Sequence, residues 1–280
     1  MALEEKKLLT SKGYLNLQDV EVYYERYDHP NPKGTLLLIH GFLSSALSFQ
    51  SLIPLLTQNY SVVVFELPGF GRSEKSLRFY YSYENYGRLT IELIKKMQLS
   101  KVIIVGHSMG GQIALQAAKQ QPSLIQDLVL ISPSGYLRRA RRAAIYCAYL
   151  PFFPWIIKQV YKRKDVHKSF SRVVFDQSLI NDEMINSYLE PFYEKNFFPC
   201  LARLFRQREG DLSSEELRSI TVPTLLLWGN EDVVTPLSIG KRLANDLPNC
   251  RLATISQAGH LLCEEHPEKV YQLICNENIG

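Results

Sequence analysis

The chain has 280 residues, of which 46% are hydrophobic and 21% charged, and this ordinary globular balance excludes disordered and fibrous classes. The length fits one large α/β domain with a smaller insertion but is short for two independent enzymes. The net charge of +4 is mild, so nucleic acid is not an expected partner.

Cysteine usage and apolar run lengths indicate the compartment. The five cysteines are odd in number and form no CxxC pair, so neither a disulfide framework nor a zinc site is expected. Residues 1–13 lack the apolar segment of a secretory signal. The longest apolar run, from Ala143 to Ile157, is shorter than a membrane span and is broken by Pro151 and Pro154. We therefore expect a cytoplasmic protein.

Short runs rich in Val, Ile and Leu alternate with longer helical patterns along most of the chain. This alternation is typical of parallel strands that are covered by helices on both faces, and it predicts a doubly wound α/β fold. Residues from Leu15 to Tyr27 alternate instead like an antiparallel hairpin at the edge of the sheet. The six predicted buried strands are residues 35–39, 61–65, 101–105, 127–131, 224–228 and 251–255.

The fourth and fifth of these strands are separated by residues 134–221, which are far too many for an ordinary crossover. Their pattern is helical and rich in aromatic residues. A helical cap over the carboxyl edge of the sheet, where ligand sites open, fits both features. We predict a core formed by residues 1–133 and 222–280 and a cap formed by residues 134–221, with an apolar pocket under the cap.

A serine bracketed by glycines follows the third buried strand. The sequence Gly106-His-Ser108-Met-Gly110 lies between that strand and an alanine-rich helical pattern. This is the G-x-S-x-G motif in the strand-to-helix context of a nucleophile elbow, where glycines permit a turn that exposes the serine Oγ. We predict Ser108 as the nucleophile. An idle serine in a glycine-rich turn is the alternative.

A serine hydroxyl needs a base to take its proton, and the base needs an acceptor that fixes its tautomer. After such an elbow, the acid and then the histidine follow in chain order, each on a loop after a strand. Asp232 and His260 occupy these positions. Glu231 is the alternative acid. The remaining histidines fit the role of base less well by position, and they are His29, His40, His107, His167 and His266.

The oxyanion that forms during acyl transfer needs hydrogen-bond donors already in place. The backbone N–H of Met109, directly after the nucleophile, is the first candidate. The second is the backbone N–H of Phe42, in the loop that follows the strand at 35–39. A loop that only turns the chain is the alternative for Phe42.

Five short motifs are spread over the chain outside the predicted cap. They are His40-Gly-Phe42, Glu66-Leu-Pro-Gly-Phe-Gly-Arg-Ser73, Gly106-His-Ser-Met-Gly-Gly111, Gly229-Asn-Glu-Asp232 and Ala258-Gly-His260. Together they resemble the α/β-hydrolase superfamily, specifically its capped, esterase-like branch. The resemblance implies an eight-stranded, mostly parallel sheet, a helical cap after the sixth strand and a catalytic triad, with no metal and no organic cofactor. Glu66 stands where the family usually has Asp, and we expect only a structural consequence.

These expectations lead to a functional hypothesis, namely hydrolysis of a small or medium carboxylic ester through an acyl-enzyme. Relatives that open epoxides or remove halide carry aspartate at the nucleophile position, so Ser108 argues against those reactions. C–C bond hydrolysis, acyl transfer and perhydrolysis on the same triad stay open. A small-molecule receptor built on the same fold is an alternative of another class.

Basic residues flank the aromatic stretch of the predicted cap. They lie at 138–142 and again at 158–164, a pattern that can mark a helix bound to anionic lipid. Pro151 and Pro154 prevent one continuous amphipathic helix and favour a cap helix that buries its aromatic side chains over the pocket. Peripheral membrane contact is the alternative. No protein partner is indicated, and the expected partner is an apolar, ester-like small molecule.

Overall fold

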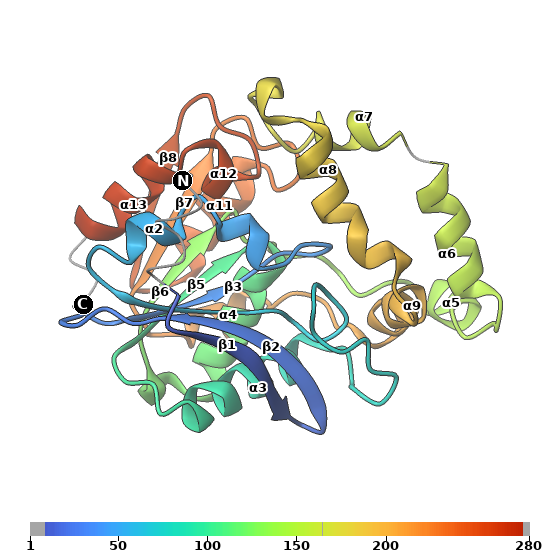
Figure 1. The fold of residues 1–280 in the computed structure, drawn as a ribbon, viewed down its shortest axis with the longest axis horizontal. Helices are drawn as coiled ribbons and strands as arrows, with labels where there is room; N and C mark the ends of the chain where they lie inside the picture. Colours follow the sequence, from blue (N-terminus) through green and yellow to red (C-terminus); the bar gives the residue numbers. More distant parts are fainter. Residues whose placement is uncertain (1–8, 164, 277–280) are drawn as a thin grey trace.

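A computed structural model describes residues 9–163 and 165–276 of the chain. Its centre is a sheet that has, within this described part, eight strands in the order β1-β2-β4-β3-β5-β6-β7-β8 (Figure 1). Strands β4 to β8 pair in parallel along this order, whereas β2 pairs antiparallel with both β1 and β4. The predicted fold class and the antiparallel hairpin at the edge are confirmed.

The strands agree closely with the six predicted apolar runs, and four of them begin or end one or two residues away from the predicted bounds. The strands are β1 (Ser11–Leu17), β2 (Val20–Tyr27), β3 (Thr35–Ile39), β4 (Ser61–Phe65), β5 (Val102–His107), β6 (Ile125–Ile131), β7 (Thr224–Gly229) and β8 (Cys250–Ile255).

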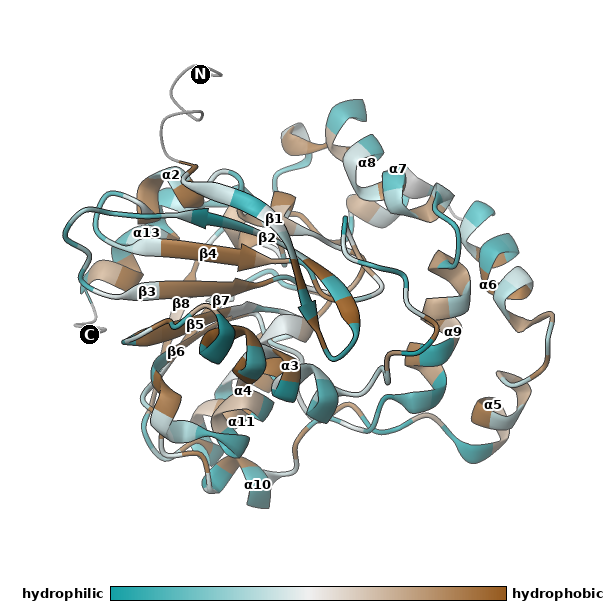
Figure 2. Cartoon of the chain, turned by 60° about the horizontal axis from the view of Figure 1, so that its bottom comes forward, coloured by the Kyte–Doolittle hydropathy of each residue, from teal (hydrophilic) through white to brown (hydrophobic). Residues whose placement is uncertain are grey.

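Helices cover both faces of the sheet, which explains why the strand sequences are continuously apolar. In β3, Leu37 packs in one core with α3 (Tyr83–Lys96), α4 (Met109–Gln120) and α11 (Leu237–Asp246). Figure 2 shows these three helices below the sheet. The neighbour of Leu37, Leu38, points to the opposite core, which contains side chains of helices on the other face. Those helices are α2 (Ile53–Leu56), α12 (Leu262–Glu265) and α13 (Pro267–Asn276).

A set of short helices lies between β6 and β7, after the sixth strand as expected. In both ribbon views, α9 lies between the sheet and the outer helices α5 and α6. The predicted boundaries at residues 134 and 221 stay a prediction. The helices are α5 (Arg142–Cys147), α6 (Phe153–Lys162), α7 (Val166–Phe170), α8 (Asp182–Leu189), α9 (Phe197–Gln207) and α10 (Ser214–Arg218), with short 3₁₀ turns at Gln177–Leu179 and Glu190–Tyr193.

None of the described helices is long and apolar enough to cross a membrane. The prediction about a secretory signal concerns a segment whose first eight residues lie outside the described part of the chain.

Candidate active site

Ser108 occupies a tight turn between the end of β5 and the start of α4. Its backbone has φ 53° and ψ −117°, a conformation that a residue with a side chain rarely adopts outside functional sites. The neighbouring glycines allow the turn to pack closely, because a Cβ on Gly106 would lie 2.6 Å from the carbonyl oxygen of Gly110. A Cβ on Gly110 would overlap the carbonyl oxygen of Ile39 in β3. The turn therefore has the geometry of a nucleophile elbow.

The structure brings Ser108, His260 and Asp232 together at the carboxyl ends of β5, β8 and β7. Ser108 Oγ lies 3.0 Å from His260 Nε2, and His260 Nδ1 lies 2.8 Å from Asp232 Oδ2. Asp232 and His260 are both buried. A proton on Nδ1 leaves Nε2 free to accept the serine hydroxyl, which is the arrangement that general-base catalysis requires.

Asp232 receives further hydrogen bonds from the turn that follows it. Its Oδ1 accepts from the backbone N–H groups of Val234 at 2.8 Å and Thr235 at 2.9 Å, and its Oδ2 accepts from Thr235 Oγ1 at 2.8 Å. Burial acts to raise the pKa of Asp232, but the bonds to His260 and Thr235 outweigh it and lower that pKa below its ordinary value. The carboxylate therefore stays ionised and holds the proton on His260 Nδ1.

Thr235 was not identified from the sequence. The available signal was its position three residues after the aspartate, where a hydroxyl can bond back to the carboxylate of the turn. Glu231, the alternative acid, has a different place: its Oε2 accepts from the backbone N–H of Ala258 at 2.9 Å. It joins the loop that carries Asp232 to the loop that carries His260.

Two further histidines lie close to the site, and both contact backbone. His107 Nε2 lies 2.9 Å from the carbonyl oxygen of His260, and burial together with the neighbouring His260 lowers the pKa of His107 to about 3. His40 Nδ1 lies 2.8 Å from the carbonyl oxygen of Gly41, while its Nε2 accepts from the N–H of Leu67 at 3.0 Å. Burial lowers the pKa of His40. Both rings are therefore neutral supports of the loops around Ser108.

The other three histidines bond to groups away from Ser108. His29 accepts a hydrogen bond from the N–H of Asn31, His167 lies near Asp182 and His266 bonds to the carbonyl of Gln257.

The two candidate oxyanion donors lie on either side of Ser108. Met109 is the first residue of α4, so its N–H has no partner within the helix. The loop after β3 passes close to the elbow, since a Cβ on Gly41 would lie 3.1 Å from Ser108 Cβ. Phe42 follows Gly41, and both Phe42 and Met109 line the same cavity as Ser108. These positions suit the stabilisation of an oxyanion at Ser108.

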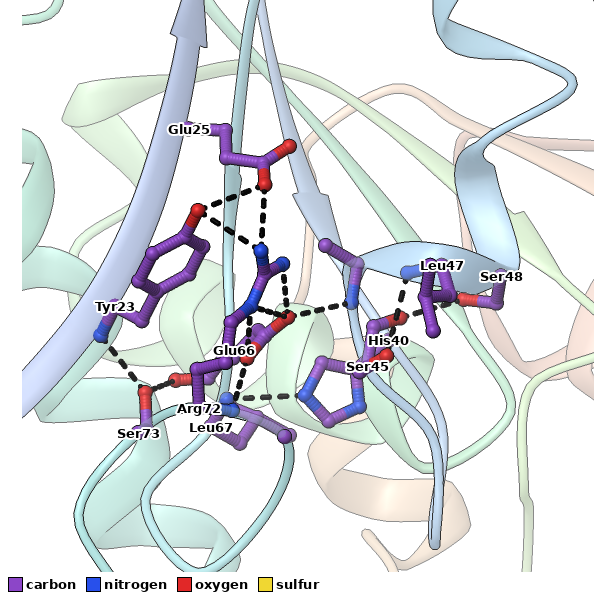
Figure 3. Close-up of polar contacts among 12 residues, drawn as sticks. Tyr23, Glu25, His40, Ser45, Leu47, Ser48, Glu66, Leu67, Arg72 and Ser73 are labelled. Atoms are coloured by element: carbon purple, nitrogen blue, oxygen red, sulfur yellow. Dashed lines mark hydrogen bonds and ion pairs between the residues drawn. The ribbon is translucent and has the colours of Figure 1, made fainter. Parts of the chain in front are cut away.

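Glu66 fastens the loop after β3 to the turn after β4 (Figure 3). It is almost fully buried, and its Oε1 accepts from the backbone N–H of Ala46 at 3.2 Å and from Arg72 Nη2 at 2.7 Å. Its Oε2 accepts from the backbone N–H of Arg72. The Arg72 guanidinium also stacks 3.8 Å over the ring of Tyr23 and pairs with Glu25 at 3.0 Å. Glu66 contacts none of the three triad candidates, in line with the structural role expected for it.

Ser108 opens onto a cavity of about 650 Å³ between the sheet and the helices that follow β6. Most of its wall is apolar, and the charged residue that lines it is Arg208, whose Nη1 donates to Tyr83 Oη at 3.1 Å. A second cavity of about 540 Å³ shares the side chain of Tyr161 with the first. Side chains that α6 and α9 contribute to the first cavity include Phe153, Ile156, Ile157, Val160, Leu201 and Leu204.

The loop that carries His260 is also bonded to the segment between β6 and β7. The N–H of His260 donates to the carbonyl of Val173 at 2.7 Å, and Glu265 Oε2 accepts from the N–H of Phe175 at 2.7 Å. Glu264, the residue before Glu265, is also bonded to this segment, because Tyr188 Oη of α8 donates to Glu264 Oε1 at 2.5 Å. Burial raises the pKa of Glu264 to about 7.

Comparison with known proteins gives matches along nearly the whole chain. Residues 36–273 match the profile of the Alpha/beta hydrolase family. The uncharacterized hydrolase YugF of Bacillus subtilis (strain 168) is 45% identical over 257 residues, which are 92% of this chain and 94% of YugF. A 2-hydroxy-6-oxononadienedioate/2-hydroxy-6-oxononatrienedioate hydrolase of Cupriavidus pinatubonensis is 26% identical over 264 residues, 88% of each chain. Among solved structures, a bacterial membrane phospholipase A superposes with a TM-score of 0.79 at 26% identity, over 98% of this chain and 88% of that one.

Proposed function

Because the chain belongs to the α/β-hydrolase family, we propose that it is a serine hydrolase that cleaves small or medium carboxylic esters through an acyl-enzyme. The family and the prediction of an enzyme are confirmed by the match over residues 36–273 and by the hydrolase relatives. The ester as substrate is our proposal. One observation carries it: hydrogen bonds link Ser108 through His260 to Asp232, and Ser108 lines an apolar cavity.

In the first half of the reaction, Ser108 Oγ attacks the ester carbonyl carbon while its proton passes to His260 Nε2. The carbonyl electron pair moves to the oxygen, and the N–H groups of Phe42 and Met109 stabilise the resulting oxyanion. Asp232 stays ionised and stabilises the protonated imidazole. When the intermediate collapses, the C–O bond to the alcohol breaks, and His260 returns the proton to the leaving alkoxide.

Deacylation repeats these steps with water in place of Ser108. His260 takes a proton from water, the hydroxide attacks the acyl carbon, and the same two N–H groups hold the second oxyanion. Cleavage of the acyl–Oγ bond releases the carboxylic acid and returns the proton from His260 to Ser108.

The cavity supports the proposed substrate class. A volume of about 650 Å³ lies within the range of small-molecule sites, and an apolar wall favours an alkyl or aryl group over a charged one. We propose that residues 134–221 act as the substrate-binding cap on a core of residues 1–133 and 222–280. Side chains of α6 and α9 would then set the preference for acyl length.

A second candidate reaction is supported by Arg208. Its guanidinium lies in the cavity wall beside Tyr83, where it could pair with a carboxylate remote from the scissile bond. The relative from Cupriavidus pinatubonensis acts, by its name, on a dicarboxylate. C–C bond hydrolysis of an acidic vinylogous diketone is therefore the alternative, and comparing its kcat/KM with that of simple esters separates the two.

The decisive experiment uses nitrophenyl esters from acetate to decanoate with the wild type and Ser108→Ala, together with fluorophosphonate labelling followed by intact mass. We expect one adduct and chain-length-dependent turnover, with both lost in Ser108→Ala, where activity falls at least about 1000-fold. Ser134→Ala is the matched control, because Ser134 lines the same cavity, and it should keep the adduct. An adduct that survives in Ser108→Ala, or a wild type without adduct and turnover, contradicts the proposal.

A further inference from the structure

We propose that residues 138–163, called here the α5–α6 surface, bind the surface of an anionic lipid bilayer. The surface comprises the chain leading into α5, the two helices and the segment that joins them. This proposal goes beyond the reaction at Ser108 and does not depend on it.

The first observation is an apolar helix, α6, none of whose side chains is fully buried. Six of the ten residues of α6 are apolar or aromatic, yet none of its side chains is buried, although the helix lies wholly within the described residues. The sequence favoured a helix that buries its aromatic side chains. Phe153 and Tyr161 do line the cavity, but Trp155 is 62% exposed, and Tyr146 in α5 is 72% exposed. The prediction was wrong for these outward-facing aromatic residues.

Exposed apolar side chains gather on this part of the chain. Of the eighteen large hydrophobic side chains that are exposed in the described residues, seven fall between positions 146 and 160. Such a concentration along one exposed segment is typical of a surface that contacts a partner or a membrane, since burial of apolar area away from water is favourable. The seven are Tyr146, Tyr149, Leu150, Phe152, Trp155, Ile156 and Val160.

The second observation is the charge of the same segment. Residues 138–163 contain seven Arg and Lys and no Asp or Glu, whereas the whole chain has a net charge of +4, so the other residues together carry −3. All seven cations are exposed. The positive charge of the molecule is thus concentrated where its apolar side chains are exposed, which suits an anionic surface. The cations are Arg138, Arg139, Arg141, Arg142, Lys158, Lys162 and Arg163.

The position of the surface leaves it accessible. Helices α5 and α6 form the outer edge of the molecule, and α9 separates them from the sheet in both ribbon views (Figures 1 and 2). Trp and Tyr side chains with one polar end favour the headgroup region of a bilayer, and basic side chains reach the phosphates around them. The arrangement therefore matches an interfacial surface in both side-chain type and placement.

Charge and chemistry select the bilayer over other occupants. A symmetric contact between two copies of this surface would place seven cations against seven, which disfavours a dimer. A nucleic acid could pair with the cations and stack on the aromatic rings. The exposed Leu150, Ile156 and Val160, however, are stabilised by contact with lipid hydrocarbon and not by contact with a phosphate backbone.

The surface also adjoins the cavity at Ser108. Ile156 and Val160 line that cavity and are at the same time 39% and 49% exposed. If the proposed esterase activity holds, an apolar ester dissolved in the bilayer can reach the cavity along these side chains without crossing bulk water. This route is a consequence of docking and not a condition for it.

The test is co-sedimentation of the full chain with vesicles of phosphatidylcholine, with and without added phosphatidylglycerol. We expect binding to the anionic vesicles that weakens as salt is added. Trp155→Ser and the double variant Arg141→Ser, Arg142→Ser should each weaken binding about 10-fold. Tyr14→Ser is the matched control, since Tyr14 is an aromatic residue 55% exposed on β1, and it should bind like the wild type. Thermal unfolding verifies that the variants are folded.

Three outcomes overturn the proposal: equal binding to neutral and anionic vesicles, unchanged binding of Trp155→Ser, and a dimer in gel filtration that Trp155→Ser abolishes. The Ser108→Ala protein should bind vesicles as the wild type does. Failure of the proposed esterase activity would therefore leave the vesicle result intact, and the two proposals can be distinguished.

Discussion

Thr235 bonds to both carboxylate oxygens of Asp232, through its backbone N–H at 2.9 Å and its hydroxyl at 2.8 Å. The carboxylate that orients His260 is therefore itself fixed in position by the residue three places further along the chain. Such a support acts on catalysis through the orientation of the base rather than through contact with the substrate's reacting atoms.

Replacing Thr235 by Val should lower kcat about 10-fold, because the hydroxyl bond to the ionised Asp232 is lost while the backbone bond remains. Thr235→Ser keeps the hydroxyl and should restore most of the activity. Steady-state kinetics on a short nitrophenyl ester measure both. If Thr235→Val changes only KM, the hydroxyl contributes to substrate binding in the cavity and not to the position of Asp232.

The two neighbouring acids should respond very differently to loss of charge. Asp232→Asn should lower kcat/KM by about 1000-fold or more, since an amide no longer holds the proton on His260 Nδ1. Glu231→Gln still accepts from the N–H of Ala258 and should lose less than about 10-fold. Measuring kcat/KM for both variants on one ester decides which acid orients His260, and a reversed order would make Glu231 the acid.

Folding stability should depend on pH through Glu264. Its ordinary pKa of 4.5 applies to the unfolded chain, whereas burial raises the folded value to about 7. The contribution of Glu264 to the free energy of unfolding is therefore greatest below about pH 4, where this carboxyl is protonated in both states. The contribution is lost as the pH rises through 7. Glu264→Gln is neutral at every pH and still accepts from Tyr188, so its free energy of unfolding should exceed that of the wild type by about 3 kcal/mol at pH 8 and match it at pH 4.

Urea unfolding at both pH values measures this difference. Glu268→Gln, an exposed position on α13, is the control and should show the same difference from the wild type at pH 4 and at pH 8. A constant difference for Glu264→Gln as well would show that this carboxyl is not perturbed by folding.

Glu66 should contribute to stability more than a surface glutamate does. Glu66→Gln keeps the length of the side chain but removes the charge that Arg72 contacts, so the free energy of unfolding should fall by about 2 kcal/mol. Glu74→Gln changes an exposed carboxylate in the same turn and should cost about 0.5 kcal/mol or less. If the free energy of unfolding falls equally in the two variants, Glu66 does not have the structural role assigned to it.

The sequence predicted those parts of the molecule that depend on local patterns. Continuous apolar runs such as 35–39 mark strands covered on both faces, and glycines around Ser108 mark the tight turn. The order of Ser108, Asp232 and His260 along the chain was sufficient to propose three residues that the fold then brings within hydrogen-bonding distance. Their catalytic roles stay a proposal until they are measured.

Other features depend on contacts between distant segments and carried no sequence signal. The hydrogen bond from His260 to Val173 joins loops 87 positions apart, and the bond from Phe175 to Glu265 of α12 joins the same two parts of the chain. The exposure of Trp155 was also unpredictable, because the apolar pattern of α6 does not distinguish a helix buried in a core from one on the surface.

The hydrogen bonds of Val173 to His260 and of Phe175 to Glu265 attach the segment between β6 and β7 to the loop that carries His260. Exchanging this segment with that of a relative would therefore alter the position of the base as well as the shape of the pocket. A chimera that keeps residues 173–176 together with the His260 loop, and takes the rest of the segment from a relative, should retain more activity than a chimera that replaces residues 173–176 as well. Exchange of the segment between β6 and β7 is therefore expected to change substrate preference and catalytic activity together.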